Sequence, residues 1–327
     1  MRSVNRYYSG LPSDHFDGLR FFNPDHPDTD RRLREMLRWR FGETRAPWPD
    51  TVAVTQAVPE ACVAGLRVTM VGHATVLIQA AGRNFLVDPV WSERASPYSW
   101  AGPRRVTAPG IAFDDLPPID AVLLTHNHYD HLDIVTLERL WRRDRPRIIA
   151  PLGNDAVIAG GAPDVAVQTG DWGDAFDFGG GASVRLHPAQ HWSARGFRDR
   201  RMALWCGFIL ETPAGHAYVV GDTGYGNGRI FRDVKALCPS LDLAIVPIGA
   251  YAPRWFMKDQ HTDPDEAVQI MLDCGARQAL GVHWGAFQLT DEPRLEPHER
   301  LAVALAAHGI DARAFLALEP GDVWTKA

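Results

Sequence analysis

The feature that most constrains this chain is a polar hexamer that directly follows a short apolar run. The hexamer occupies residues 126–131 with the sequence HNHYDH, and the apolar run AVLL occupies residues 121–124. Such a run predicts a buried strand. Residues two apart project to the same side of an extended backbone, so His126 and His128 leave the end of this strand together. These two histidines can therefore hold one metal ion.

Asp130 and His131 complete the hexamer where the chain turns into an amphipathic stretch over residues 132–141. They point away from the first two histidines and can hold a second ion close to the first. Imidazole and carboxylate ligands suit zinc, with manganese and iron(II) as alternatives. The other interpretation is a solvated loop. Three histidines within six residues, in a chain that has 13 in total, favour the metal site.

The composition is that of a globular protein with a substantial core, because 46% of the residues are hydrophobic and 10% are aromatic. The formal net charge is −6, and the basic clusters, such as those at residues 31–34 and 142–143, are short. We therefore expect no nucleic-acid partner.

The cysteines are far apart and form no C-x-x-C pair, which argues against a disulfide framework and against a cysteine zinc site. We expect all four to be reduced core residues, namely Cys62, Cys206, Cys238 and Cys274. No segment approaches the roughly 20 apolar residues that span a bilayer, and the first residues contain no apolar stretch. The expected location is the cytoplasm, with peripheral contact at the inner membrane face for a lipid substrate.

The chain divides into an N-terminal extension, residues 1–66, and a main domain, residues 67–327. The extension is rich in proline, charge and tryptophan, and its one predicted helix covers residues 30–40. In the main domain, strands are predicted at 67–72, 75–79, 84–87, 121–124, 147–150, 184–186, 204–211, 217–220, 243–247 and 278–281. Helices are predicted at 132–141, 265–274 and 297–308. This order predicts an α/β fold with two packed sheets and helices outside.

A site for two ions needs more ligands than the hexamer supplies, and these must come from other strand ends. His191 follows the predicted strand at 184–186, and Asp222 ends an apolar strand at a glycine-rich turn. His283 likewise leaves a strand. His261 lies just before a helix, whose N-terminus attracts anions.

Other polar residues near these positions have supporting roles or compete with them. Asp88 follows the apolar residues 85–87 and can orient a ligand histidine. His73 fits the same role, or that of a packed polar residue, and His187 competes with His191. The remaining histidines sit in polar or helical surroundings and are predicted to lie on the surface: His15, His26, His216, His298 and His308.

The order of these residues resembles the metallo-β-lactamase superfamily, with a strand, the pattern H-x-H-x-D-H, and then a lone histidine, aspartate and histidine. The resemblance implies an αββα four-layer sandwich with a dinuclear site at the edge of the sheets. It also implies two Zn²⁺ per chain, one held by His126, His128 and His191, the other by Asp130, His131 and His283, and both by Asp222.

Within that superfamily the chain resembles the N-acylphosphatidylethanolamine-hydrolysing phospholipase D family. The matching segments lie at residues 94–97, 116–123, 126–133, 221–225, 247–251, 253–258 and 283–285. The sequence PRWFMK at 253–258 is far more specific than the metal motif. The resemblance implies a lipid phosphodiester as substrate, N-acylethanolamine and phosphatidic acid as products, and a homodimer.

For this reaction, Asp130 and Asp222 are the carboxylates nearest to the proton that must move, and His261 is the predicted contact for the phosphate or the leaving group. A lipid substrate also needs an apolar surface beside the metal site for its acyl chains. Trp255, Phe256 and Trp284 are the predicted substrate contacts. With Trp192, Met257 and Phe287 they either line an acyl groove or belong to the core.

The ligand residues also distinguish this reaction from other functions found on the same fold. A di-iron oxidoreductase of this fold would carry glutamate in place of His128, and a non-catalytic relative would have lost ligands. Neither description applies to this sequence. Hydrolysis of lactones or other esters, and of small soluble phosphodiesters, uses the same ligands and stays an alternative.

Overall fold

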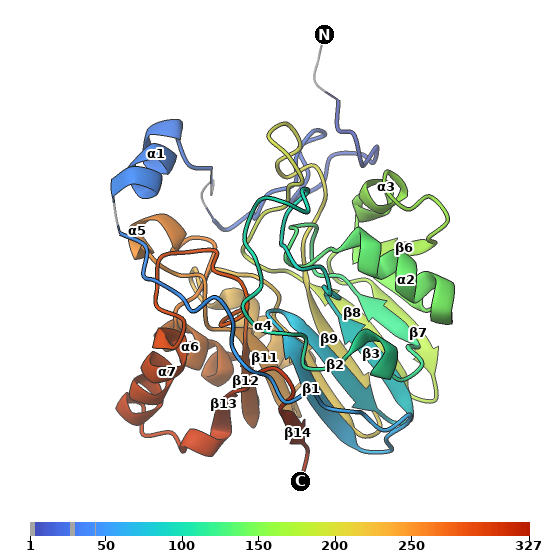
Figure 1. Ribbon diagram of the computed structural model, residues 1–327. Coiled ribbons are helices and arrows are strands. Elements are labelled where there is room, and N and C mark those ends of the chain that lie inside the picture. Colours follow the sequence, from blue (N-terminus) through green and yellow to red (C-terminus); the bar gives the residue numbers. More distant parts are fainter. Residues whose placement is uncertain (1–3, 27–29, 43) are drawn as a thin grey trace.

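Two seven-stranded sheets pack face to face within residues 4–26, 30–42 and 44–327, which the computed structural model describes (Figure 1). The first sheet has the order β14-β1-β2-β3-β4-β5-β6. Its strands are β1 (Leu66–Gly72), β2 (Thr75–Ala80), β3 (Arg83–Val87), β4 (Ala121–Leu123), β5 (Arg147–Pro151), β6 (Val167–Gly170) and β14 (Val323–Thr325). The last strand of the chain therefore pairs with the first, in antiparallel register.

The second sheet has the order β13-β12-β11-β10-β9-β8-β7. Its strands are β7 (Ala175–Gly179), β8 (Ala182–His187), β9 (Gly207–Thr212), β10 (Gly215–Val219), β11 (Leu243–Pro247), β12 (Gln278–Val282) and β13 (Phe315–Ala317). Every residue of β11 is buried, and its neighbours β10 and β12 run parallel to it. A strand that is buried on both faces must be covered on both sides, as parallel strands usually are.

Helices supply the outer cover, so the molecule has four layers. Leu137 of α2 (Ile134–Asp144) and Ile158 of α3 (Asn154–Ala159) pack with the outer face of the first sheet. The second sheet is covered by α4 (Arg229–Leu237), α6 (Pro264–Cys274) and α7 (Glu296–Ala307). Side chains of both sheets, such as Phe85 and Phe208, form the core between them. This confirms the predicted αββα sandwich.

Local sequence explains why α6 begins and ends where it does. Asp263 caps its N-terminus by accepting from the backbone NH of Glu266, whose side chain accepts in return from the backbone of Asp263. Pro264 occupies the first helical position, where no backbone NH is needed. The helix ends at Gly275, in the left-handed conformation that favours glycine. The segment that precedes α6 is thereby held at a defined place.

The N-terminal segment carries α1 (Leu33–Gly42), which lies beside the short helix α5 (Arg254–Met257) (Figure 1). Trp39 packs on Phe256 with ring centroids 4.8 Å apart, and its Nε1 donates to Asp291 at 2.7 Å. Arg31 donates to the carbonyl of Phe256 and pairs with Asp259. Aromatic packing, a hydrogen bond and an ion pair therefore hold the extension against the loop between β11 and α6.

The predicted elements differ from the observed ones mainly at edges and in short pieces. The prediction lacked β6, β7, β13 and β14, and it lacked α3, α4 and α5. Strand β7 lies at a sheet edge, and its apolar alternation consists of only two half-buried residues, Phe176 and Phe178, which is too short a pattern to predict a strand. The predicted strand at 204–211 begins later, at Gly207.

The burial predictions for Cys62 and His15 need correction. Cys62 is exposed, whereas the other three cysteines are buried as expected. His15 is not a surface histidine, because only 7% of it is exposed. It stacks on Trp172 and bridges Asp14 and Asp171. Within the described residues, every helix is too short or too polar to cross a bilayer.

Candidate metal centre

All seven predicted metal-binding residues lie at one edge of the two sheets, although they come from distant parts of the chain. The hexamer follows β4, His191 follows β8, Asp222 follows β10 and His283 follows β12. Because β10, β11 and β12 are parallel, their carboxyl ends share this edge. The sheets thus bring together side chains that the sequence separates by up to about half of its length.

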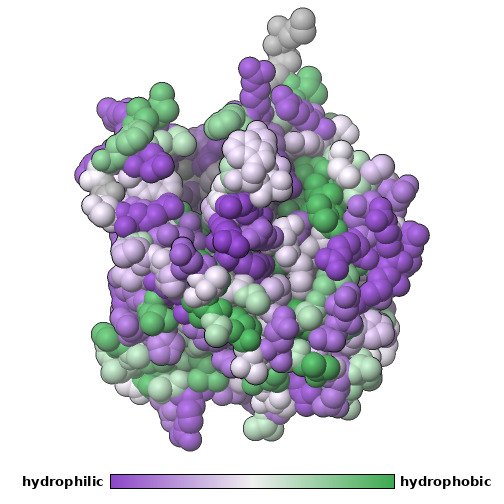
Figure 2. Space-filling model, viewed as in Figure 1, coloured by the Kyte–Doolittle hydropathy of each residue, from purple (hydrophilic) through white to green (hydrophobic). Residues whose placement is uncertain are grey.

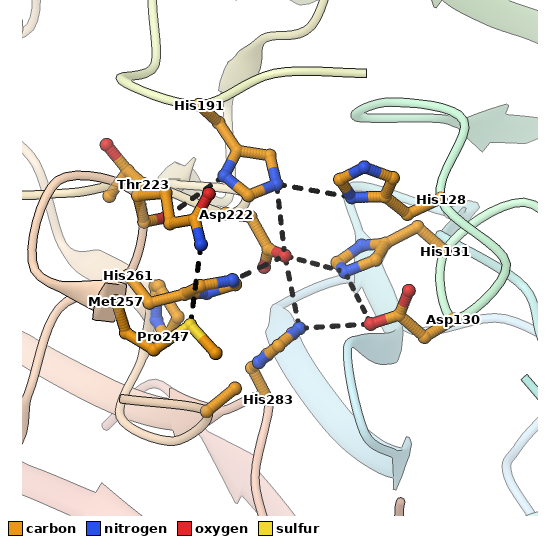
Figure 3. Close-up of polar contacts among 12 residues, drawn as sticks. His128, Asp130, His131, His191, Asp222, Thr223, Pro247, Met257, His261 and His283 are labelled. Carbon is orange, nitrogen blue, oxygen red and sulfur yellow. Dashed lines mark hydrogen bonds and ion pairs between the residues drawn. The ribbon is translucent and has the colours of Figure 1, made fainter. Parts of the chain in front are cut away.

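Asp222 is at the centre of the cluster (Figure 3). Its Oδ2 atom lies 3.1 Å from His283 Nε2, 3.2 Å from His131 Nε2, 3.6 Å from His191 Nε2, 3.8 Å from His126 Nε2 and 4.0 Å from His261 Nδ1. One carboxylate oxygen therefore faces five imidazoles from four segments.

The remaining contacts divide the cluster into two groups that share Asp222. In one group, His128 Nδ1 lies 2.8 Å from His126 Nε2 and 3.3 Å from His191 Nε2. In the other, Asp130 Oδ2 lies 3.0 Å from His73 Nε2, 3.2 Å from His283 Nε2 and 3.5 Å from His131 Nε2. Each group holds its donor atoms within 4.8 Å of one another, the spacing of a metal site.

Burial and the two carboxylates shift the pKa values of the histidines in opposite directions. Burial lowers the pKa of both His128 and His191 to about 3, because a buried cation is costly. Burial also acts on His283, but the carboxylates of Asp222 and Asp130 outweigh it and raise the pKa of His283 to about 9. The same two carboxylates raise the pKa of His131 well above its usual value despite its burial.

The donor atoms fit a metal because the protein leaves some of them without a hydrogen-bond partner. The Nε2 atom of His131 and the Nδ1 atom of His261 face Asp222, are buried and have no hydrogen-bond partner among the described residues. Buried polar atoms in proteins nearly always have partners. Nitrogen and carboxylate oxygen donors arranged in two adjoining groups are the ligands expected for transition metals.

Asp88 supports the centre from behind, as predicted for a residue that orients a ligand. Its Oδ2 accepts from His131 Nδ1 at 2.8 Å and from the Thr125 hydroxyl at 2.6 Å, and its Oδ1 accepts from the Thr125 backbone NH at 2.7 Å. His73, Asp88 and His283 adopt positive φ angles of 53°, 40° and 64°. Such backbone conformations are uncommon for non-glycine residues and gather at functional sites.

Sequence reasoning missed Thr125 and Gln260. The backbone carbonyl of Gln260 accepts from His191 Nδ1 at 3.0 Å, and its side-chain oxygen accepts from Trp192 Nε1 at 2.6 Å. Trp192 places its ring against His128 with centroids 4.3 Å apart. Thr125 directly precedes the hexamer and could have been found from that position, whereas no local pattern marks Gln260.

His261 also belongs to the cluster, and His187 does not. His261 forms a third group of donor atoms with Asp222 and His283, and 13% of its side chain is exposed. His187 instead donates from Nε2 to the carbonyl of Ile230 at 2.8 Å. The competition between His187 and His191 is therefore decided by geometry in favour of His191.

The predicted substrate contacts are less open than expected. Trp284 is 5% exposed and packs into the core beneath α6 and α7, so it does not line a groove. Phe256 is also 5% exposed because Trp39 covers it. Trp255 is half-buried, with the guanidinium of Arg38 4.4 Å from its ring centroid. Of the three, only Trp255 keeps an accessible surface.

Comparison with known proteins agrees with this geometry. The family described as "Beta-lactamase superfamily domain" matches residues 83–284. A relative from Caenorhabditis elegans, named N-acyl-phosphatidylethanolamine-hydrolyzing phospholipase D 1, is 37% identical over 273 residues, which are 80% of this chain and 76% of that protein. This chain belongs to the N-acylphosphatidylethanolamine-hydrolysing phospholipase D family of the metallo-β-lactamase superfamily. It is a metal-dependent hydrolase of this fold.

More distant matches support the family and the fold. A mitochondrial protein of Saccharomyces cerevisiae with the same enzyme name is 34% identical over 239 residues, which are 72% of this chain and half of that protein. The crystal structure of an isothiocyanate hydrolase from Delia radicum gut bacteria has a TM-score of 0.62 at 20% identity. It covers 80% of this chain and all of that structure. At this identity, the likeness concerns the fold alone.

Proposed function

We propose that this hydrolase cleaves the phosphodiester bond of N-acylphosphatidylethanolamine to give N-acylethanolamine and phosphatidic acid, with two zinc ions at its metal centre. The observation that supports two ions is the place of Asp222. Its Oδ2 faces His126 and His191 of one group and His131 and His283 of the other. The substrate class is taken from the enzyme name that the nematode and yeast relatives share.

In this proposal the ligands are His126, His128 and His191 for the first zinc, Asp130, His131 and His283 for the second, and Asp222 for both. Zinc at these positions would supply a hydroxide nucleophile near neutral pH and polarise the phosphoryl oxygens. Asp88 fixes the orientation of His131 through the hydrogen bond to Nδ1, and His73 holds Asp130 through Oδ2.

Asp130 is the better placed of the two carboxylates to move a proton. Its Oδ2 is engaged by three histidines, whereas its Oδ1 accepts no hydrogen bond from any described residue. Its side chain is 13% exposed, against 3% for Asp222. We assign proton transfer to Asp130 Oδ1 and the central, charge-holding role to Asp222.

His261 contacts the phosphate or the leaving alkoxide in this proposal. Its side chain is partly exposed, and its ring lies 5.1 Å from that of His191 and 5.4 Å from that of His283, measured between centroids. Arg254 donates to its backbone carbonyl at 2.8 Å and holds the residue in place. Trp255, in the short helix α5 that precedes His261, offers apolar surface to an acyl chain.

Helix α1 supports contact with a lipid surface. None of its residues is buried, and four large apolar side chains are exposed, namely Leu33 (70%), Met36 (46%), Leu37 (48%) and Phe41 (80%). Figure 2 shows this hydrophobic surface at the upper left, with hydrophilic residues around it. Arg34, Arg38 and Arg40 lie on the same helix, and a helix with exposed apolar residues and arginines suits an anionic membrane surface.

The first experiment combines elemental analysis with hydrolysis of N-acylphosphatidylethanolamine, of bis(p-nitrophenyl) phosphate and of a lactone, each with and without a chelator. Two zincs per chain and chelator-sensitive lipid cleavage are the expected result. Cleavage of the small diester alone would remove the lipid from the proposal, and cleavage of a lactone alone would change the reaction class. Asp222→Asn should bind less metal, and full metal content with unchanged turnover would refute its central role.

A second experiment tests the membrane contact separately from the chemistry. Phe41→Asp should weaken binding to vesicles that contain phosphatidylglycerol and leave turnover of the small soluble diester unchanged. Val303→Asp is the matched control, because Val303 is 69% exposed on α7, away from α1. Equal vesicle binding by the two variants would exclude α1 as the docking surface.

A further inference from the structure

A second set of metal-binding side chains lies at the other end of β10 from Asp222. Glu211 of β9 and His216 of β10 face each other across the hairpin, in register. Cys238 ends α4 and is 3% exposed. The carboxylate oxygen, imidazole nitrogen and sulfur of these three residues lie within 4.8 Å of one another.

The fold itself, rather than a mobile surface loop, brings the three side chains together. Side chains two apart along a strand share a face, so Glu211 lies on the face of Ile209 and His216 on that of Tyr218. Ile209, Tyr218 and Cys238 belong to one buried cluster beneath α4. The cluster of ligands therefore sits at the junction between the hairpin and the end of the helix.

Within the described residues, the imidazole and the carboxylate of this set lack a side-chain partner, while the Cys238 sulfur accepts from the backbone NH of Ser240. His216 Nδ1 is buried without a hydrogen-bond partner, although sequence analysis placed His216 among the surface histidines. In the part of the chain that the structure describes, the Glu211 carboxylate forms neither a hydrogen bond nor an ion pair with another side chain. Burial, with the nearby charges of Glu211 and Asp242, raises the pKa of the Cys238 thiol to about 11.

We propose that Glu211, His216 and Cys238 form an additional mononuclear metal site that takes zinc. Sulfur, imidazole nitrogen and carboxylate oxygen together are typical zinc ligands, whereas magnesium and calcium prefer oxygen alone. Zinc bond lengths of about 2.0–2.3 Å place tetrahedral ligand atoms about 3.3–3.8 Å apart, so the side chains need to close by only about 1 Å.

Binding at this site replaces the thiol proton of Cys238, which passes to solvent, and forms a sulfur–metal bond without any change of oxidation state. Three protein ligands leave one coordination position for water on the half-exposed side of Glu211 and His216. The bound ion links the β9–β10 hairpin to the end of α4, segments that are more than 20 residues apart, and should raise the melting temperature.

Cobalt(II) added to the metal-depleted protein tests this site selectively. Neither group of the candidate centre contains cysteine, so a near-ultraviolet thiolate-to-cobalt charge-transfer band reports on a cysteine outside that centre, which the variants below identify. The wild-type protein should show the band with one equivalent at saturation, and Cys238→Ser should abolish it. His216→Gln should weaken cobalt binding at this site at least tenfold. Cys62→Ser and His308→Gln are matched controls outside the cluster and should keep the band.

Zinc content gives a second readout. The wild-type protein should hold one zinc more than Cys238→Ser, while both keep the metal of the candidate centre, which also shows that the variant is folded. The proposal is independent of the hydrolytic function, since Asp222→Asn should keep the cobalt band. A wild-type protein without the band, or a band that survives in Cys238→Ser, would overturn it.

Discussion

Replacing Asp88 by asparagine should weaken metal binding by about 10- to 100-fold while the fold is kept. The Asp88 carboxylate accepts three hydrogen bonds, one from His131 Nδ1 and two from Thr125. Asparagine has one oxygen with which to accept them. A hydrogen bond to a charged group contributes about 1.5–3 kcal/mol, and 1.4 kcal/mol corresponds to a factor of ten. Loss of the bond to His131 therefore predicts this range, which is also typical for residues that orient metal ligands.

The substitution isolates charge and hydrogen bonding from backbone strain. Asp88 has a φ angle of 40°, and asparagine tolerates the left-handed region as well as aspartate does. Competition with a chelator of known affinity measures the effect. Asp133→Asn is the control, because Asp133 is a buried carboxylate that caps α2 and touches no imidazole. Wild-type affinity in Asp88→Asn, or an equal loss in Asp133→Asn, would refute the reasoning.

Three further results are expected. Burial opposes protonation of His15, but Asp171 and Asp14 raise its pKa above the ordinary 6.5. Its stabilising effect is therefore full below about pH 6.5 and is lost as the pH rises through the raised pKa. Urea unfolding of His15→Gln at about pH 6 and about pH 8.5 should show a smaller pH dependence than the wild type. Trp192→Phe removes the bond to Gln260 and should lower the unfolding free energy by about 1 kcal/mol, measured by denaturant titration. Metal removal should lower the melting temperature in calorimetry, since an ion at 100 times its Kd stabilises by about 2.7 kcal/mol.

The parts of the fold that sequence predicted well are the buried ones. Strand β11 was predicted with its observed bounds because all five of its residues are apolar and buried. Helix α6 was predicted within one residue, since Asp263, Pro264 and Gly275 mark its ends. Edge strands such as β7 and β14 were missed because three to five residues, mostly exposed or half-buried, are too few to establish an apolar periodicity. Local patterns also do not show which strands pair with each other or how the two sheets pack together.

The site residues that sequence predicted are likewise those with a clear local pattern. Residues at the ends of buried strands, such as His191 and Asp222, were found because a polar residue after an apolar run is conspicuous. Backbone contacts were not, since the carbonyl of Gln260 looks the same in any sequence. Trp284 was assigned to substrate from its proximity along the chain to His283, yet successive residues point to opposite sides and its ring enters the core.

The pairing of β14 with β1 has a consequence for how the protein is made. Residues 323–325 form the strand that borders Leu66–Gly72, so the first sheet is incomplete until about 250 residues have been added after β1. His283 is needed as well, and it is made about 150 residues after the hexamer. A nascent chain halted before β12 can form neither metal-binding group that includes His283. The group of His126, His128, His191 and Asp222 can form earlier, so the group with Asp130, His131 and His283 is expected to take its metal ion last.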